Sequence, residues 1–333
     1  MTHDTQTSGV LGQENYQYLP VPDWPQIPND IDFVEAIGVA VSQDDRVFVF
    51  NRGNPAVLIF QPDGQFIDAW GEDVFVRPHG ITAAPDETLY LTDDLGHRIA
   101  QFTLEGQLLR NIGPAGIPSQ TGVSKFDYRS ITSAGPYNLP TNVAVAADGH
   151  LFIADGYGNA SIHHFDADGN LVRTWGAPGD AVGQFNVPHG ICVDARGRIL
   201  VADRENSRIQ IFDRKGTLLQ TWTDIIRPCQ VFAGADDVFF VAELGNQNGR
   251  FPWQPRPPQP TGGRVSIFDG DGSLLSRWGG GLDARQPDAF YACHDICVDS
   301  KGNIYVGEVA VTAATAAGED ATGLPTLRKF VRA

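Results

Sequence analysis

Apolar and polar residues alternate in short runs along this chain, and turn residues separate the runs. The segment from Thr141 to Gly176 shows the pattern most clearly, with four runs that each read as a β-strand. Asp148-Gly149 and Asp168-Gly169-Asn170 separate the paired runs, and such sequences favour tight hairpin turns. The pattern therefore predicts four antiparallel strands in a unit of about 40 residues.

The unit recurs along the chain. Its copies begin near Asp32, His79, Thr141, His189, Cys229 and His294. Several fourth runs end in Trp-Gly, and we expect this aromatic residue to close the packing between neighbouring units. The repeats predict an all-β fold, a six-bladed β-propeller over residues 32–333. Residues 1–31 form an N-terminal extension, from which Tyr16 to Trp24 could supply a strand that closes the ring.

Three predicted insertions interrupt the repeat, near residues 114–138, 245–263 and 310–325. Long loops in a compact fold are usually functional or disordered. The second insertion is rich in proline and contains Phe251 and Trp253. It could be a polyproline ligand for another domain, or it could cover the mouth of the ring.

Composition narrows the set of partners. The chain has 333 residues and a net charge of −16, which argues against nucleic acid or an anionic membrane surface as a partner. The N-terminal residues lack a basic segment followed by an apolar one, and no run of about 18 apolar residues occurs. We therefore expect no membrane span and a cytoplasmic location.

Histidine occupies one repeat position in every second unit. In chain order this position holds Ile37, His79, Thr141, His189, Cys229 and His294. Alternate units of a six-membered ring are related by a threefold axis, so the three imidazoles should converge on it. Three neutral imidazoles with an open fourth position suit zinc, although iron or another divalent ion would fit the same ligands.

Other polar residues should gather near the histidines. The loops after the second strands return to the histidine face, and they carry Arg52, Tyr157 and Arg204. Asp295 follows His294 directly and should point away from it, toward the strand backbones inside the ring. A buried carboxylate needs a partner. Calcium, held also by backbone carbonyls, is one solution, and an arginine or amide donors are the other.

Residues 141–213 carry a family resemblance. Its motifs are Ala-Asp-Gly-Tyr-Gly-Asn over 154–159, Gln-Phe-Asn-Val-Pro-His-Gly over 184–190 and Val-Ala-Asp-Arg-Glu-Asn-Ser-Arg-Ile-Gln over 201–210. These motifs closely resemble the lyase domain of peptidylglycine α-amidating enzymes, an NHL-type six-bladed propeller of four-stranded blades. The resemblance is thinner in blades one, two and six, and weak in blade five. It implies a peptidyl-α-hydroxyglycine α-amidating lyase, which splits a carbinolamide, N–CH(OH)–R, into an amide and an aldehyde such as glyoxylate.

The resemblance also implies roles for individual residues. His79, His189 and His294 match the zinc ligands of the family. Asp295 matches a structural calcium ligand, with the backbone carbonyls of Val39 and Ile81 in the matching places. Arg52, Tyr157 and Arg204 match active-site residues, and the tyrosine is the proposed base. The implied partner is a small-molecule or short-peptide substrate.

The chain departs from the family at two places close to these residues. Ala292-Cys293 stands where the family has methionine-proline, which alters the pocket wall, and Gly158 replaces a disulfide cysteine beside the tyrosine. Two other functions stay open on the same fold. One is a metal-dependent hydrolase or hydratase, such as a lactonase, and the other is a non-catalytic NHL scaffold. Three histidines on alternate units favour the lyase over both.

Overall fold

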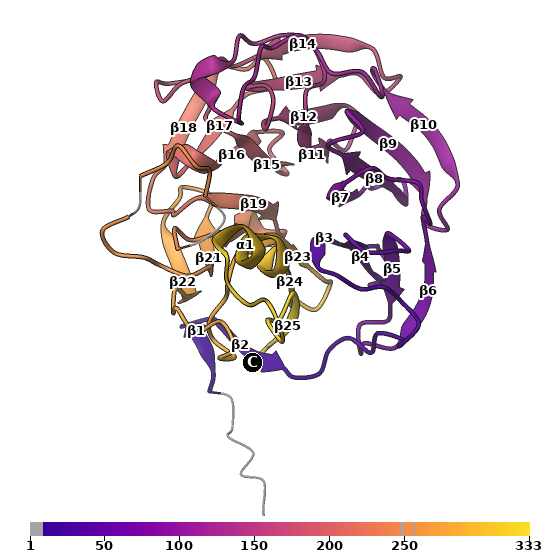
Figure 1. Ribbon diagram of the computed structural model, residues 1–333, viewed down its shortest axis with the longest axis vertical. Helices are drawn as coiled ribbons and strands as arrows, with labels where there is room; N and C mark the ends of the chain where they lie inside the picture. The colour runs from indigo at the N-terminus through magenta and orange to yellow at the C-terminus, as the bar shows by residue number, and fades with distance from the viewer. Residues whose placement is uncertain (1–8, 248–249, 256) are drawn as a thin grey trace, which may run out of the picture.

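The computed structural model describes residues 9–247, 250–255 and 257–333. Six antiparallel blades follow one another around a central axis, and each first strand lies innermost (Figure 1). Residues 1–8 of the predicted N-terminal extension, and residues 248–249 and 256 of the second predicted insertion, lie outside the described residues. The prediction of an all-β six-bladed β-propeller is confirmed.

The first five blades each contain four consecutive strands. Blade one contains β3 (Ala36–Val41), β4 (Val47–Asn51), β5 (Val57–Phe60) and β6 (Phe66–Trp70). Blade two contains β7 (Pro78–Ala83), β8 (Thr88–Asp93), β9 (Arg98–Thr103) and β10 (Leu108–Ile112). Blade three contains β11 (Pro140–Val145), β12 (Leu151–Asp155), β13 (Ser161–Phe165) and β14 (Leu171–Trp175). Blade four contains β15 (Pro188–Val193), β16 (Ile199–Asp203), β17 (Arg208–Phe212) and β18 (Leu218–Trp222). Blade five contains β19 (Pro228–Ala233), β20 (Val238–Glu243), β21 (Arg264–Asp269) and β22 (Leu274–Gly279).

The sixth blade combines strands from both ends of the chain. It contains β23 (Cys293–Val298), β24 (Ile304–Glu308), β25 (Leu327–Arg332), β2 (Tyr16–Val21) and the short β1 (Leu11–Gln13). Strand β2 pairs antiparallel with β25, with Leu19 opposite Val331. The fourth strand of the last blade therefore comes from the N-terminal part of the chain, and this pairing joins the two ends of the ring.

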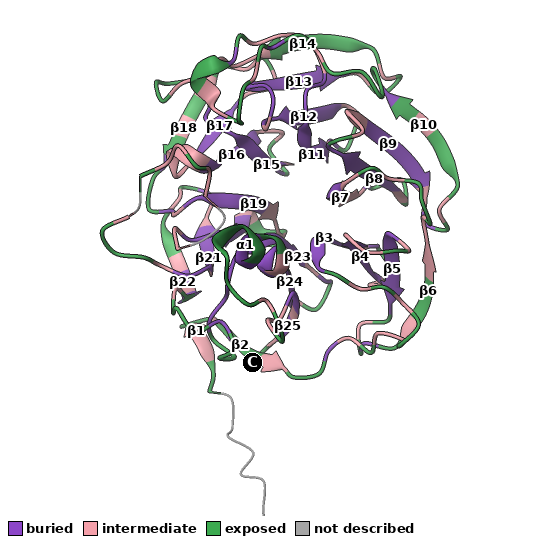
Figure 2. Cartoon of the chain, in the orientation of Figure 1, coloured by how far each residue is buried: buried purple, intermediate pink, exposed green. Residues whose placement is uncertain are grey.

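Burial falls from the axis of the ring to its rim. Strand β4, which lies between its own blade neighbours and the adjacent blades, is apolar at four of five positions and wholly buried. The outer strand β14 has four exposed positions of five (Figure 2). Inner strands thus read as continuous apolar runs because both of their faces are covered.

Tryptophans at the ends of outer strands pack against glycines of the next blade. A Cβ atom added to Gly106 of blade two would lie 2.5 Å from the ring of Trp70 in blade one. Gly216 of blade four stands in the same relation to Trp175 of blade three, at 2.9 Å. The expected aromatic closure between blades is confirmed at these positions, because only glycine leaves room for the indole.

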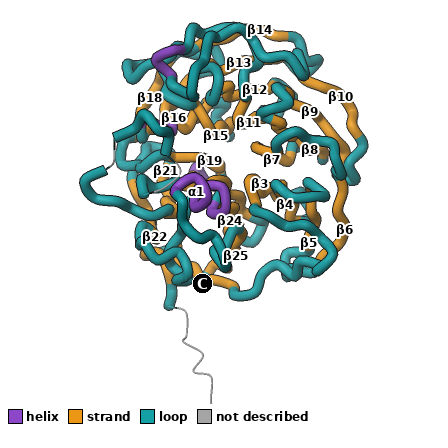
Figure 3. The backbone as a smooth tube through the Cα atoms, in the orientation of Figure 1, coloured by secondary structure: helices purple, strands orange, loops and turns teal. Residues whose placement is uncertain are grey.

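The described segments between strands contain little helix (Figure 3). Helix α1 (Ala310–Ala317) precedes β25, and three short 3-10 helices are η1 (Tyr128–Ser130), η2 (Arg204–Asn206) and η3 (Ala235–Asp237). Across the described ranges, no helix has the length and apolar character needed to cross a membrane.

Candidate metal centre and active site

The first strand of every blade has an irregular register close to its start. In blade two the pairing of β7 with β8 shifts between Pro78 and Ile81, and in blade four that of β15 with β16 shifts between Pro188 and Ile191. In blade six the shift falls between Cys293 and Asp295. A β-bulge re-aims the side chains next to it. In these three blades the bulge includes the histidine.

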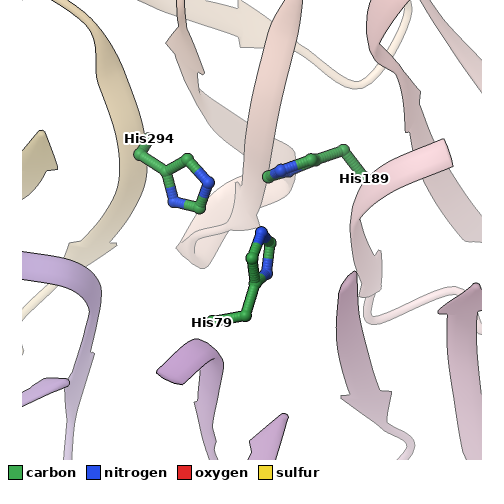
Figure 4. Close-up of side chains that lie close together, drawn as sticks. All are labelled: His79, His189 and His294. Atoms are coloured by element: carbon green, nitrogen blue, oxygen red, sulfur yellow. The ribbon is translucent and has the colours of Figure 1, made fainter. Parts of the chain in front are cut away.

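The three histidines meet on the axis of the ring. His79, His189 and His294 come from β7, β15 and β23, and their rings point toward one another (Figure 4). The ring centroids are 4.7 to 4.9 Å apart, and one nitrogen from each ring lies within 4.8 Å of the other two. All three side chains are buried. The structure therefore brings together the three residues predicted as metal ligands.

The other ring nitrogen of each histidine is bound by the neighbouring blade. The Nδ1 atoms of His79, His189 and His294 lie 2.6, 2.8 and 2.7 Å from the carbonyl oxygens of Thr141, Cys229 and Ile37. A carbonyl only accepts, so Nδ1 carries the proton and Nε2 keeps its lone pair. The carbonyls that fix the tautomer thus come from blades one, three and five. They belong to the residues that occupy, in those blades, the repeat position of the histidine.

Electrostatics favours the neutral form of these imidazoles. Burial lowers the pKa of all three histidines well below 6.5. The positive charge of Arg52 adds to this at His79 and His294, and that of Arg204 adds to it at His189. Three buried neutral imidazoles that each keep an Nε2 lone pair fit a divalent transition metal.

Tyr157 and Arg204 adjoin the histidine cluster directly. The hydroxyl of Tyr157 lies 3.1 Å from Nε2 of His79 and 3.0 Å from Nε2 of His189. Nη1 of Arg204 donates to the same hydroxyl at 3.1 Å. A phenolic oxygen thus sits beside two of the three ligand nitrogens with a guanidinium next to it, which suits a group that exchanges protons.

Arg52 lies on the same face of the ring as the histidines but contacts other residues. It donates to Glu35 at 3.0 Å and to Thr312 of α1 at 2.9 Å. The main-chain N–H of Thr312 donates to the other oxygen of Glu35. Arg52 therefore holds α1 at the histidine side of the ring, and it acts on His79 and His294 through its charge.

Asp295 faces the channel inside the ring, away from the histidines. It lines a cavity of about 160 Å³ together with Val39, Ile81 and Gln230. Its carboxylate accepts hydrogen bonds of 2.9 Å from the main-chain N–H groups of Val39 and Ile296. Burial raises its pKa to about 7 in spite of these donors and the amide of Gln230. Amide donors thus bind Asp295 here, Val39 contributing its N–H, and the calcium role of Asp295 with the Val39 and Ile81 carbonyls stays a prediction.

Arg77 and Asp94 form a second ion pair near the site that the sequence reasoning missed. Arg77 donates to both carboxylate oxygens of Asp94, at 2.6 and 2.7 Å, and its charge acts on His79. Glu35 and Arg52 occupy the same two repeat positions in blade one, with the charges exchanged. Comparing these positions between repeats would have revealed the pair.

Glu205 is a further residue that the sequence reasoning missed. It is buried between two guanidiniums, accepting from Arg204 at 2.7 Å and from Arg227 at 2.9 Å, and the side chain of Gln254 also donates to it. Burial alone would raise the pKa of this carboxyl, but the charges of Arg227 and Arg204 lower it to about 2. Glu205 therefore remains ionised and fixes the position of Arg204 beside Tyr157.

Comparison with known proteins agrees with the pattern of repeats. Residues 185–212 match the family model of the NHL repeat. NHL repeat-containing protein 3 of Homo sapiens is 29% identical over 234 residues, which cover 66% of this chain and 62% of that protein. Peptidyl-alpha-hydroxyglycine alpha-amidating lyase 1 of Drosophila melanogaster is 29% identical over 339 residues, covering 90% of this chain and 59% of that protein. The chain carries an NHL repeat and resembles the amidating lyases.

A shorter match leads to the same enzyme class. The probable peptidyl-alpha-hydroxyglycine alpha-amidating lyase pgal-1 of Caenorhabditis elegans is 31% identical over 163 residues, covering 48% of this chain and 43% of that protein. This NHL-repeat chain thus spans 43% to 62% of the length of the three curated relatives described here. Two of these three relatives are named amidating lyases.

Solved structures with the same fold come from more than one enzyme class. A catalytically inactive virginiamycin B lyase from Staphylococcus aureus aligns with a TM-score of 0.59 at 13% identity, covering 97% of this NHL-repeat chain and 99% of that chain. A gluconolactonase from Xanthomonas campestris aligns with a TM-score of 0.60 at 15% identity, covering 99% and 93%. At such identities these likenesses show the propeller fold alone.

Proposed function

We propose that this protein is a zinc-dependent lyase that cleaves the C–N bond of a carbinolamide of the α-hydroxyglycine type. The products are an amide and an aldehyde such as glyoxylate, and the substrate is a small molecule or a short peptide. The single observation that carries the proposal is the contact of the Tyr157 hydroxyl with Nε2 of His79, Nε2 of His189 and Nη1 of Arg204. This contact puts a proton acceptor beside the ligand nitrogens.

The chemistry divides between the metal and the residues around it. His79, His189 and His294 would hold the zinc, which would serve as a Lewis acid for the substrate hydroxyl. Tyr157 takes the hydroxyl proton as the general base, and Arg204, which donates to its phenolic oxygen, orients it. As the C–N bond breaks, the oxygen that lost its proton forms the carbonyl double bond of the aldehyde. The electron pair of the C–N bond goes to the nitrogen, which takes the proton back from Tyr157. The reaction needs no further reactant.

The first test measures metal and turnover in the same preparation. We expect about one zinc per chain, by elemental mass spectrometry on protein purified without a metal-affinity tag, because three buried imidazoles form one site. We also expect this protein to release glyoxylate from N-acyl-α-hydroxyglycines. An aldonolactone serves as the competing substrate, since a gluconolactonase shares the fold. Opening of the lactone without release of glyoxylate would replace the lyase proposal by the hydrolase alternative.

Arg77 is the residue we propose to bind the carboxylate of such a substrate. Its side chain is 32% exposed, against 15% for Arg52 and 5% for Arg204. Asp94 holds its guanidinium in place from the buried side. An exposed guanidinium with a fixed orientation suits recognition of a carboxylate.

Replacing Arg77 by methionine should weaken substrate binding more than catalysis. A charge-assisted hydrogen bond contributes about 1.5–3 kcal/mol, so we expect KM to rise by about 10- to 100-fold while kcat changes little. Steady-state kinetics with an α-hydroxyglycine and with its methyl ester separates the effects, since the ester lacks the charge. Arg110→Met, on the outer strand of the same blade, is the matched control. An equal rise in KM for acid and ester would remove Arg77 from this role.

A further inference from the structure

Two insertions meet above Tyr157 and form a wall of aromatic rings. Phe126, between blades two and three, stacks on Phe251 of blade five with ring centroids 5.8 Å apart and an angle of 19°. Both rings stand nearly perpendicular to the ring of Tyr157, at centroid distances of 6.4 and 6.5 Å. The proposed base is therefore bordered by two phenylalanines from distant parts of the chain.

Contacts on several sides hold this wall in place. The guanidinium of Arg204 lies over the ring of Phe251 at 5.6 Å, and Trp253 stacks on Phe251 at 5.6 Å. Gln254 ties the same segment to buried Glu205. Phe126 has a φ of 55°, a conformation that is uncommon for a bulky residue.

One residue of the wall borders a cavity. Phe251 also lines a cavity of about 570 Å³ between the second insertion and α1, whose other lining residues include Pro252 and Ala313 as well as the polar Gln254 and Glu319. Cavities of this size accept small organic ligands. Phe126 remains 38% exposed although its ring is large and apolar. Phe126 and Phe251 thus offer apolar ring surface beside Tyr157, and Phe251 reaches from there to the cavity.

We propose that Phe126 and Phe251 form a subsite for an aromatic or bulky apolar N-acyl group of the substrate. This inference rests on the proposed lyase function and specifies the class of its substrate. A carbinolamide of the α-hydroxyglycine type has two arms at the reacting carbon, a carboxylate and an N-acylated nitrogen. Arg77 belongs to blade two, which lies across the ring from blade five (Figure 1). The carboxylate therefore extends toward Arg77 and the acyl arm toward the phenylalanines.

The kinetic test compares N-benzoyl-α-hydroxyglycine with N-acetyl-α-hydroxyglycine. We expect the natural sequence to prefer the benzoyl compound by about tenfold or more in kcat/KM, because a stacked ring gains both area and aromatic contact. Phe251→Ala and Phe126→Ala should each lose most of this preference, which is measured as the ratio of kcat/KM for the two compounds so that a general loss of activity cancels. Phe66→Ala, on the outer strand β6, should keep it. An unchanged preference in both wall variants would overturn the subsite.

A binding measurement separates this inference from the proposed reaction. N-benzoylglycine and N-acetylglycine lack the hydroxyl and cannot be cleaved, so calorimetry reports their affinities without turnover. Tighter binding of the benzoyl compound, reduced about tenfold or more in Phe251→Ala, supports the subsite even if neither hydroxylated compound is cleaved, an outcome that rejects only the lyase proposal. Equal affinities for the two compounds overturn the subsite. Phe251→Leu, which keeps an apolar side chain, replaces the alanine variant if circular dichroism shows that the latter is unfolded.

Discussion

The His189→Ala protein is expected to purify without its metal and to lose about a thousandfold or more in kcat. Removing one of three imidazoles leaves two ligands, and the Lewis acid contributes several kcal/mol to the reaction, each 1.36 kcal/mol being a factor of ten in rate. The cavity left by the ring lies on the axis, where His189 packs against His79 and His294. Metal content by elemental mass spectrometry and release of glyoxylate are measured on the same sample.

The control for this variant is a histidine away from the axis. His150→Ala removes an imidazole beside the hairpin between β11 and β12, where it contacts His164. We expect this variant to keep both metal and turnover. If the His189→Ala protein binds as much zinc as the natural sequence, the three histidines are not the metal site. The lyase mechanism, which depends on that site, would then also be wrong.

Tyr157→Phe should lower kcat by about a hundredfold to ten-thousandfold, the usual range for loss of a positioned acid–base group. Phenylalanine keeps the ring that packs against Phe126 and Phe251, so KM and metal content should stay close to those of the natural sequence. The ring also contacts His79, His189 and Arg204, so the substitution removes only the hydrogen bonds of the hydroxyl to them. Steady-state kinetics with one N-acyl-α-hydroxyglycine measures the effect.

Tyr16→Phe provides the matched control for loss of a phenolic hydroxyl. Tyr16 lies on β2 at the outer edge of blade six. We expect its replacement by phenylalanine to leave kcat unchanged. Turnover that is the same in Tyr157→Phe as in the natural sequence would show that another group takes the proton. If that variant also retains zinc, only the assignment of Tyr157 as the base would be wrong, and the metal site would stand.

The convergence of the histidines could be predicted because it depends only on repeat register and sixfold order. His79, His189 and His294 stand at one repeat position in alternate blades, and any six-membered ring brings such positions together. Blade topology placed Tyr157 and Arg204 on the histidine side, because the loops after the second strands return to that face. Alternation along a strand predicted that Asp295 turns away from His294, and Asp295 lines the cavity inside the ring.

The groups that hold these residues could not be predicted in the same way. Each histidine is oriented by a main-chain carbonyl, which any residue can supply, so Ile37, Thr141 and Cys229 carry no signal in their side chains. Glu205 joins Arg227 and Gln254, which are distant in sequence from it. The stacking of Phe126 on Phe251 depends on the path of two irregular segments, for which hydrophobic pattern gives no register.

The pairing of β2 with β25 links the histidine cluster on the axis to the two ends of the chain. His294 of blade six donates to the carbonyl of Ile37 in blade one, a contact that crosses the point where the ring is joined. An ion that binds three alternate blades therefore has high affinity only for the closed ring. By mass action, a metal bound by the three histidines and the terminal strand would stabilise each other. Loss of the peripheral strand β2 would consequently lower the affinity of the three histidines for a metal.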